Sequence, residues 1–264
     1  MLKLGVIDVL NVLPVYYGIL SQKVEVESKL VFGKVTELNK KLNQGEIDCS
    51  VISSFEYAQN PDKYFILPNL SVSADGAVKS IYLFLKKPLS ELKNDTINLT
   101  ESSLTSVNLI QYLLKDFSIN YIKDNKSDSA GELLIADEAI SRFYQKRDAF
   151  VYDLSELWKK KTGLPFVFAL WVVRRDVYKN NPEEVKKLYQ NLIKSKEISK
   201  DLLMQAAQDR YHNIFPNEKL CYDYLVNLHS DFSEPYQQGF NLFQEKMVKI
   251  KRLQNIAKLS FLPV

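Results

Sequence analysis

The sequence predicts an α/β protein of two lobes, whose chain passes from one lobe to the other twice. Three observations support this fold class. Short apolar stretches alternate with helical patterns from residue 2 to about residue 158, whereas residues 182–259 contain only helical patterns. Between these parts lies the longest uninterrupted apolar run, residues 164–173, which contains no charged side chain. Such a run is typical of a strand buried on both faces. We therefore expect it to return to a sheet that the chain left earlier.

The first part of the chain is expected to form one sheet with its helices. Thr36 is the predicted N-cap of a helix that Gly45 closes. The polar segment 86–92, which contains Pro88, is predicted to be the first crossing between lobes. The expected strands are residues 2–10, 24–32, 47–52, 64–72 and 80–85, and the expected helices are residues 15–20 and 37–43.

The second lobe is expected to follow this crossing, and a helical tail to pack back on the first lobe. Pro182 followed by two glutamates suits the first turn of a helix. Lobe one is thus predicted to comprise residues 1–86 and 170–264, and lobe two residues 87–169. The strands expected in lobe two are residues 96–99, 118–122, 133–136 and 149–152, with helices at 100–116 and 137–144; the tail helices are residues 182–209, 217–230 and 234–257.

Composition excludes several classes of protein. In 264 residues, 46% hydrophobic content suffices for packed cores. The 35 basic and 32 acidic residues are spread without blocks, so the sequence shows no electrostatic footprint for nucleic acid or a membrane surface. The chain enters a strand at once, without a signal peptide, and its longest apolar run is shorter than the ~20 residues of a membrane span. We expect a cytoplasmic protein whose two cysteines, Cys49 and Cys221, are reduced.

Small hydroxyl side chains gather at two predicted strand-to-helix junctions, one in each lobe. The carboxyl ends of strands are where open α/β sheets bind ligands, and helix N-termini favour anions. Each hydroxyl could instead simply cap its helix, a contribution of about 1 kcal/mol. The two clusters in separate lobes nevertheless favour a binding role. The candidates are Ser53 and Ser54 in lobe one, and Ser102, Ser103, Thr105 and Ser106 in lobe two.

Further polar candidates follow other predicted strands. Asn11 offers both a donor and an acceptor, or is a turn former ahead of Pro14. Ser80 lies near the first crossing and is either a site residue or an ordinary residue at a strand end. Asp137 and Asp153 either cap helices or face the cleft, with capping favoured. Arg174 and Arg175 either clamp a carboxylate or meet solvent and acidic neighbours, which is the commoner outcome.

Four segments in order closely resemble the chorismate dehydratases of the futalosine route to menaquinone. The likeness begins in the first strand with Asn11-Val-Leu-Pro14, includes residues 99–107, extends to Arg175 and fades in the helical tail. The loop before Asn11 departs from the family pattern, because Asp8 stands where a Ser or Asn is expected. The four segments are Gly45-Glu-Ile-Asp48, Val51-Ile-Ser-Ser-Phe-Glu-Tyr-Ala58, Tyr152-Asp-Leu-Ser-Glu-Leu-Trp158 and Thr162-Gly-Leu-Pro-Phe-Val-Phe-Ala-Leu-Trp171.

This resemblance implies a type II periplasmic-binding-protein-like fold that serves as an enzyme, with its substrate between the lobes. The implied reaction converts chorismate to 3-[(1-carboxyvinyl)oxy]benzoate with loss of water. By resemblance, Asn11 is the expected catalytic side chain. Ser80 is a second catalytic candidate because of its place near the hinge, and Asp137 and the hydroxyl clusters, which follow strands, are expected to bind the substrate. No metal-ligand spacing and no nucleotide motif occurs in the sequence, so a reaction without metal or cofactor is expected. Oligomeric state, monomer or homodimer, is left open.

Both histidines, His212 and His229, fall in the helical tail, so no side chain stands out as a general base. We therefore expect the substrate's own enolpyruvyl carboxylate to take the ring proton. Four other functions remain to be weighed. A transport-type solute-binding protein would carry an export signal. The related enzyme dihydroxynaphthoate synthase is expected to hold a histidine in its cleft. A ligand sensor would carry a DNA-binding segment. A cytoplasmic protein that binds small anions without catalysis is a further alternative.

Overall fold

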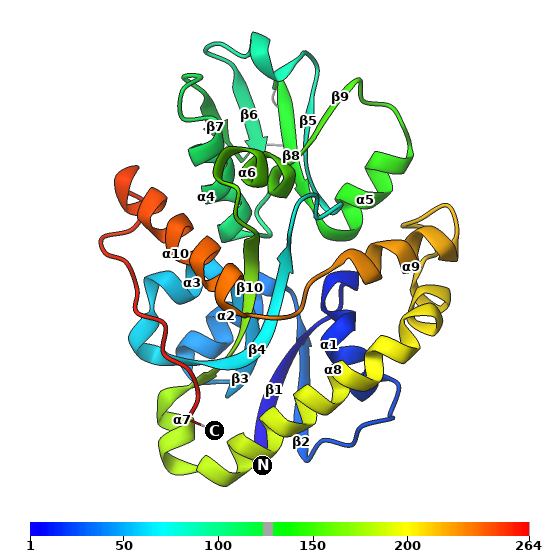
Figure 1. Cartoon of the computed structure of the whole chain (residues 1–264), viewed down its shortest axis with the longest axis vertical. Coiled ribbons are helices and arrows are strands. Elements are labelled where there is room, and N and C mark those ends of the chain that lie inside the picture. The colour runs from blue at the N-terminus through cyan, green and yellow to red at the C-terminus, as the bar shows by residue number, and fades with distance from the viewer. Residues whose placement is uncertain (124–128, 264) are drawn as a thin grey trace.

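The chain forms two α/β lobes, each built around its own five-stranded sheet (Figure 1). The computed structural model describes residues 1–123 and 129–263. The first sheet has the order β2-β1-β3-β10-β4, formed by Ser28–Gly33, Leu2–Ile7, Cys49–Ser53, Phe166–Arg174 and Tyr64–Ala74. The second has the order β7-β6-β8-β5-β9, formed by Asn120–Ile122, Thr96–Leu99, Gly131–Ile135, Ile81–Leu85 and Phe150–Asp153.

Helices connect these strands and cover the sheets. In the first lobe they are α1 (Leu13–Leu20), preceded by the 3-10 turn η1 (Leu10–Val12), α2 (Val35–Gln44), α3 (Ser54–Gln59) and α7 (Arg175–Asn180). In the second lobe they are α4 (Leu104–Leu113), α5 (Ala136–Tyr144) and α6 (Leu154–Thr162). The tail forms α8 (Pro182–Arg210), α9 (Glu218–Asn227) and α10 (Glu234–Lys249). No helix in the described ranges is long and apolar enough to cross a membrane.

The apolar run is a central strand of the first sheet, as its composition predicts. β10 pairs antiparallel with β3 on one side and with β4 on the other. Leu170, Trp171, Val172 and Val173 are completely buried, which explains why the run carries no charge. Its pairing with β4 already begins at Phe166. The second crossing therefore precedes Phe166, and the expected boundary between residues 169 and 170 is too late.

The first crossing also lies earlier than the sequence predicted. β5, which the sequence analysis placed in lobe one, is hydrogen-bonded to β8 and β9 of the second sheet. The chain therefore leaves the first lobe between Ala74 and Ile81, and the polar segment 86–92 lies inside the second lobe. All five residues of β5 are buried, so their composition is equally compatible with either sheet. Which sheet this strand joins depends on pairing partners far away in the sequence.

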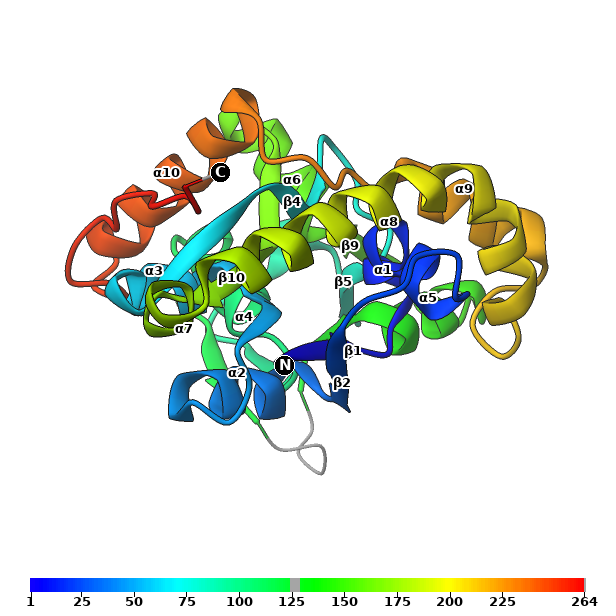
Figure 2. The same ribbon diagram turned by 90° about the horizontal axis from the view of Figure 1, so that it is seen from below.

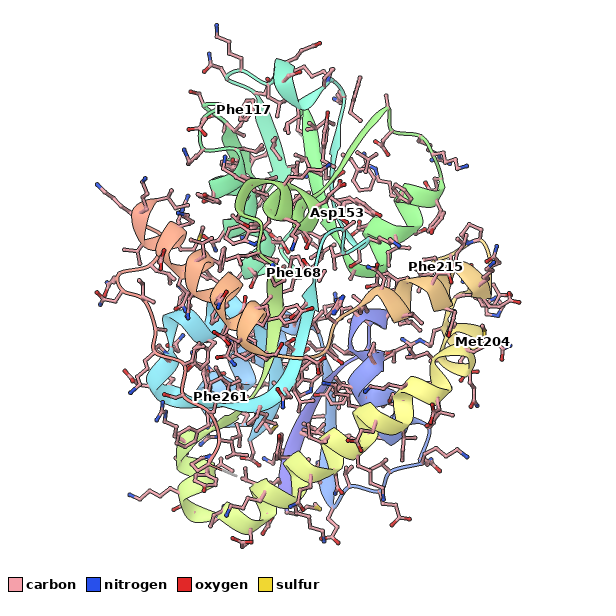
Figure 3. The ribbon with its side chains drawn as sticks, viewed as in Figure 1. Phe117, Asp153, Phe168, Met204, Phe215 and Phe261 are labelled. Carbon is pink, nitrogen blue, oxygen red and sulfur yellow. The ribbon has the colours of Figure 1, made fainter. Side chains whose placement is uncertain are left out.

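Asp153 fixes the first crossing to the start of α6. Its carboxylate accepts hydrogen bonds from Ser155 N at 2.9 Å and Glu156 N at 3.1 Å, so it caps the helix as expected. The same carboxylate accepts the backbone N–H groups of Val78 at 3.2 Å and Lys79 at 2.7 Å. Burial raises the pKa of Asp153, while these four N–H groups favour its ionised form. Figure 3 shows Asp153 near the junction of the lobes.

The helical tail contacts both lobes. Figure 2 shows α8 running across the molecule beside α1. The turn after α8 carries Phe215, whose ring lies 5.4 Å from that of Tyr144 on α5, between ring centroids. Farther along the chain, α10 packs against β10, where the ring of Phe243 meets that of Phe166 at 5.1 Å. The two lobes are therefore linked by the packing of the tail as well as by the two chain crossings.

Candidate active site

A cavity of about 600 Å³ lies between the two lobes. Its wall in the first lobe comes from the carboxyl ends of β1, β2 and β3, from the first half of β10, from β4, and from the starts of η1 and α2. Its wall in the second lobe comes from the starts of α4 and α5. Phe168 of β10 contributes an aromatic ring at the place where the lobes meet (Figure 3). A cavity of this size at a lobe interface is the expected place for a small-molecule ligand.

Several helices begin at this cavity, beside four acidic side chains and one lysine. The wall includes Val9 and Asn11 at the start of η1, Val35 at the start of α2, Ser103 at the start of α4 and Ala136 at the start of α5. Helix N-termini carry N–H groups without partners inside the helix, and the helix dipole places partial positive charge there. The arrangement is suited to a small organic anion that touches both lobes.

Asn11 lies on the cavity wall, as the sequence analysis predicted. It is half-buried in η1, directly after β1. Its side-chain amide makes no hydrogen bond with any residue in the ranges 1–123 and 129–263. The NH₂ group of such an amide can donate a hydrogen bond to a carboxylate or to a departing hydroxyl. Its carbonyl oxygen can accept one from a protonated carboxyl group or from a hydroxyl. The amide of Asn11 thus lies on the cavity wall without a partner among the described residues, and its catalytic role stays a prediction.

Four of the predicted serines line the cavity, and two of them also cap their helices. Ser103 Oγ accepts the N–H of Ser106 at 3.1 Å and donates to Ser106 Oγ at 3.0 Å. Ser53 Oγ accepts the N–H of Glu56 at 3.2 Å. Ser102 is exposed at the edge of the same wall. Capping and ligand binding are therefore not exclusive here, because the capped helix start is itself part of the cavity.

Ser54 and Thr105 lie behind the wall and join the two lobes. Thr105 Oγ1 accepts the N–H of Phe55 at 3.1 Å, donates to Phe168 O at 3.2 Å and lies 3.3 Å from Ser54 Oγ. Ser54 Oγ in turn donates to Val167 O at 2.8 Å. Both side chains are completely buried. Their contacts hold the starts of α3 and α4 together, and the substrate-binding role predicted for them stays a prediction.

Ser80 and Asp137 both lie near the start of α5. Ser80 is buried beneath the wall, and its carbonyl accepts the N–H of Ala136 at 2.7 Å. Asp137 lies on the wall, where its Oδ1 accepts the N–H of Leu10 from the opposite lobe at 3.4 Å. Burial raises the pKa of Asp137, against the influence of Leu10 N–H and Arg210. The carboxyl group thus bridges the lobes at the cavity.

The remaining candidates lie away from the cavity. Arg174 binds Asp176 and the carbonyl of Ile47, and Arg175 binds the carbonyls of Tyr64 and Pro61. Arg174 thus meets an acidic neighbour, as favoured, and Arg175 instead binds backbone carbonyls of the first lobe. His212 and His229 are not among the wall residues, so neither histidine is placed as a base. In the described ranges there is no cluster of three or more histidine, cysteine and acidic side chains that could hold a metal ion.

The sequence analysis missed one part of the wall, the junction between β2 and α2. The helix begins at Val35 with Lys34 as N-cap, so Thr36 lies within its first turn rather than at the predicted cap position. Phe32, Lys34 and Thr36 all line the cavity. A signal was present, because this junction follows a strand in the same way as the junction at Ser53. From the sequence, Thr36 was assigned only a capping role, and the junction after the predicted strand 24–32 was not considered as part of a site.

Comparison with known proteins agrees with this geometry. Residues 2–249 match the model of a protein family described as menaquinone biosynthesis. The chain belongs to this family. It is 31% identical over 233 residues to a chorismate dehydratase from Thermus thermophilus, covering 80% of this chain and 83% of that protein. It is 30% identical over 230 residues to a chorismate dehydratase from Campylobacter jejuni, covering 81% of this chain and 92% of the relative.

Solved structures confirm the fold of this family member. A protein from Archaeoglobus fulgidus matches with a TM-score of 0.69 at 17% identity, over 95% of this chain and 97% of the other. A Candida albicans protein described as having the generic periplasmic binding protein fold matches with a TM-score of 0.66 at 10% identity, over 100% and 98% of the two chains. At such identities the likeness shows the fold alone. The predicted two-lobed, periplasmic-binding-protein-like architecture is confirmed.

Proposed function

We propose that this protein is a chorismate dehydratase that converts chorismate to 3-[(1-carboxyvinyl)oxy]benzoate and water. The observation that carries the proposal is the cavity between the lobes, where helix N-termini and the amide of Asn11 converge. Chorismate is a dianion, and a cavity lined by helix starts and serine hydroxyls is suited to its two carboxylates. Membership of the family and the two dehydratase relatives support the same substrate.

The reaction demands orientation more than a strong base. One ring C–H bond and the C–OH bond of the neighbouring ring carbon break, a third double bond forms between these two carbons, and the proton and the hydroxyl leave as water. The ring, which already held two double bonds, thereby becomes a benzene ring. The aromatic product supplies the driving force, so the protein's main task is to hold the reacting groups in line and away from water. No histidine lies on the cavity wall, and the enolpyruvyl carboxylate of the substrate takes the ring proton in this proposal. Asn11 orients that side arm or the departing hydroxyl.

The test is incubation of the purified protein with chorismate, followed by mass spectrometry and ultraviolet absorption. The expected product is lighter than chorismate by one water, is aromatic and keeps its enolpyruvyl ether. His212→Ala serves as a control that should keep wild-type kcat, because His212 lies off the cavity. Tight binding of chorismate without turnover would contradict the proposal and favour a non-catalytic binding protein. An inactive but folded His212→Ala enzyme would contradict the assignment of the base.

A further inference from the structure

We propose that Lys34 is a specificity-determining residue that binds one of the two carboxylates of the substrate. This inference rests on the proposed function for the identity of the dianion. Among the described residues, Lys34 is the one cation on the cavity wall. The wall also carries four acidic side chains, Asp8, Glu37, Asp137 and Glu138. A dianion that enters this cavity therefore needs a counter-charge, and Lys34 is in position to supply it.

The two neighbouring acids of the first lobe have their salt-bridge partners elsewhere. Glu37 is bound to Lys41 by a salt bridge of 2.5 Å, and this partner, with a smaller contribution from Lys34, lowers the pKa of Glu37. Asp8 is paired with Arg210 at 2.6 Å. Lys34 itself makes no salt bridge with any residue in the ranges 1–123 and 129–263. Its ammonium group is exposed before the ligand binds and becomes part of the ligand's contact surface when a carboxylate approaches.

The position of Lys34 also predicts a preference for ligands with two carboxylates over ligands with one. Lys34 stands at the start of α2 in the first lobe, whereas Ser103 and Ser106 stand at the start of α4 in the second. In this proposal the ring of the substrate lies between the two places, with one carboxylate at each helix start. Phe32, which is 54% exposed on the same wall, offers an apolar surface beside Lys34 for the body of the ligand. A monocarboxylate would satisfy only one of the two places.

The experiment measures calorimetric binding of three stable probes to the full-length protein. 3-(Carboxymethoxy)benzoate carries both carboxylates, 3-methoxybenzoate carries only that of the ring, and phenoxyacetate carries only that of the side arm. The variant is Lys34→Met, with Lys34→Arg as the charge-preserving partner. Lys40→Met is the matched control, because Lys40 is exposed on the same helix and does not line this cavity. Turnover of chorismate is measured in parallel.

Lys34→Met should weaken binding of the dicarboxylate by about tenfold, which is about 1.4 kcal/mol. It should weaken one of the two monocarboxylates to a similar degree and leave the other within about twofold. Lys34→Arg should restore most of the affinity, and Lys40→Met should change none. Unchanged binding of all three probes in Lys34→Met would overturn the proposal, as would equal weakening of both monocarboxylates. A protein that binds the dicarboxylate through Lys34 but does not dehydrate chorismate would overturn only the proposed function.

Discussion

Replacement of Thr105 by valine separates a structural role from a substrate-binding role. The exchange keeps the shape of the side chain and removes its hydroxyl, which is completely buried. That hydroxyl accepts the N–H of Phe55 at 3.1 Å and donates to Phe168 O at 3.2 Å. Because the valine methyl group can do neither, a backbone donor and a backbone acceptor lose their partner in a dry interface. The expected effect is therefore on stability.

The magnitude follows from the groups left without partners. A buried polar group that loses its partner costs about 1–3 kcal/mol, so the pair should cost roughly 3 kcal/mol in all. For a chain of this size, such a loss lowers Tm by roughly 6–12 °C. Ser54 keeps its bond to Val167 O, which limits the damage. Because Thr105 does not line the cavity, KM for chorismate should stay within about twofold of wild type.

The assay is urea unfolding followed by circular dichroism and by tryptophan fluorescence, together with steady-state kinetics. Trp158 is in the second lobe and Trp171 in the first, and both are completely buried, so the fluorescence change reports on both lobes. Thr36→Val is the matched control, since Thr36 lines the cavity and is exposed; it should change stability by less than about 0.5 kcal/mol. Wild-type stability of Thr105→Val with a KM raised tenfold or more would refute the reasoning and show that this hydroxyl meets the substrate.

Three further changes test other parts of the site and its support. Asn11→Leu should lower kcat by about 100-fold without change in Tm, because the amide meets the reacting groups and no described residue; a kcat near that of wild type would remove Asn11 from the mechanism. Burial raises the pKa of Asp137, so the folded protein holds the carboxyl proton of Asp137 more tightly than the unfolded chain does. The contribution of Asp137 to the free energy of unfolding therefore declines as pH rises from about 4. Asp137→Asn should therefore gain unfolding free energy relative to wild type between pH 4 and pH 7, and a constant difference across that range would contradict this. Gly239→Ala should destabilise by about 1–3 kcal/mol, because the new Cβ would lie 2.1 Å from Pro165 O and force α10 away from the second crossing; the neighbouring exposed Gln238→Ala is the control, and equal Tm values for the two variants would show that α10 can shift freely.

Local sequence patterns were sufficient to predict much of the fold and part of the cavity. The uncharged run at 164–173 favoured a strand buried on both faces, because ten consecutive apolar residues rich in valine and aromatic side chains are typical of a central strand. The junctions at Ser53 and Ser103 were visible as strands followed by capping residues, and the structure places both on the cavity wall. Asn11 follows the first predicted strand, but its local pattern left a turn former equally possible, and the family resemblance was needed to favour it.

Other features depended on contacts between distant parts of the chain. Ser54 is next to Ser53 and Thr105 is next to Ser106, yet one of each pair lines the cavity and the other lies behind it. Adjacent residues of a helix point about 100° apart, so only one of two neighbouring hydroxyls can face the cavity. Which of the two does so depends on how the two lobes are docked. The sheet that β5 joins was likewise decided by β8 and β9.

The amino-acid sequence by itself determined where strands give way to helices and which of these junctions carry polar side chains, because those signals reside in neighbouring residues. The tertiary structure alone decided which junctions share one cavity, and it thereby brought Lys34 to the same wall as Asn11 and Ser103. The physical reason is that a helix cap needs only its own turn, whereas a cavity for a dianion needs surfaces from two lobes whose docking is set by long-range packing.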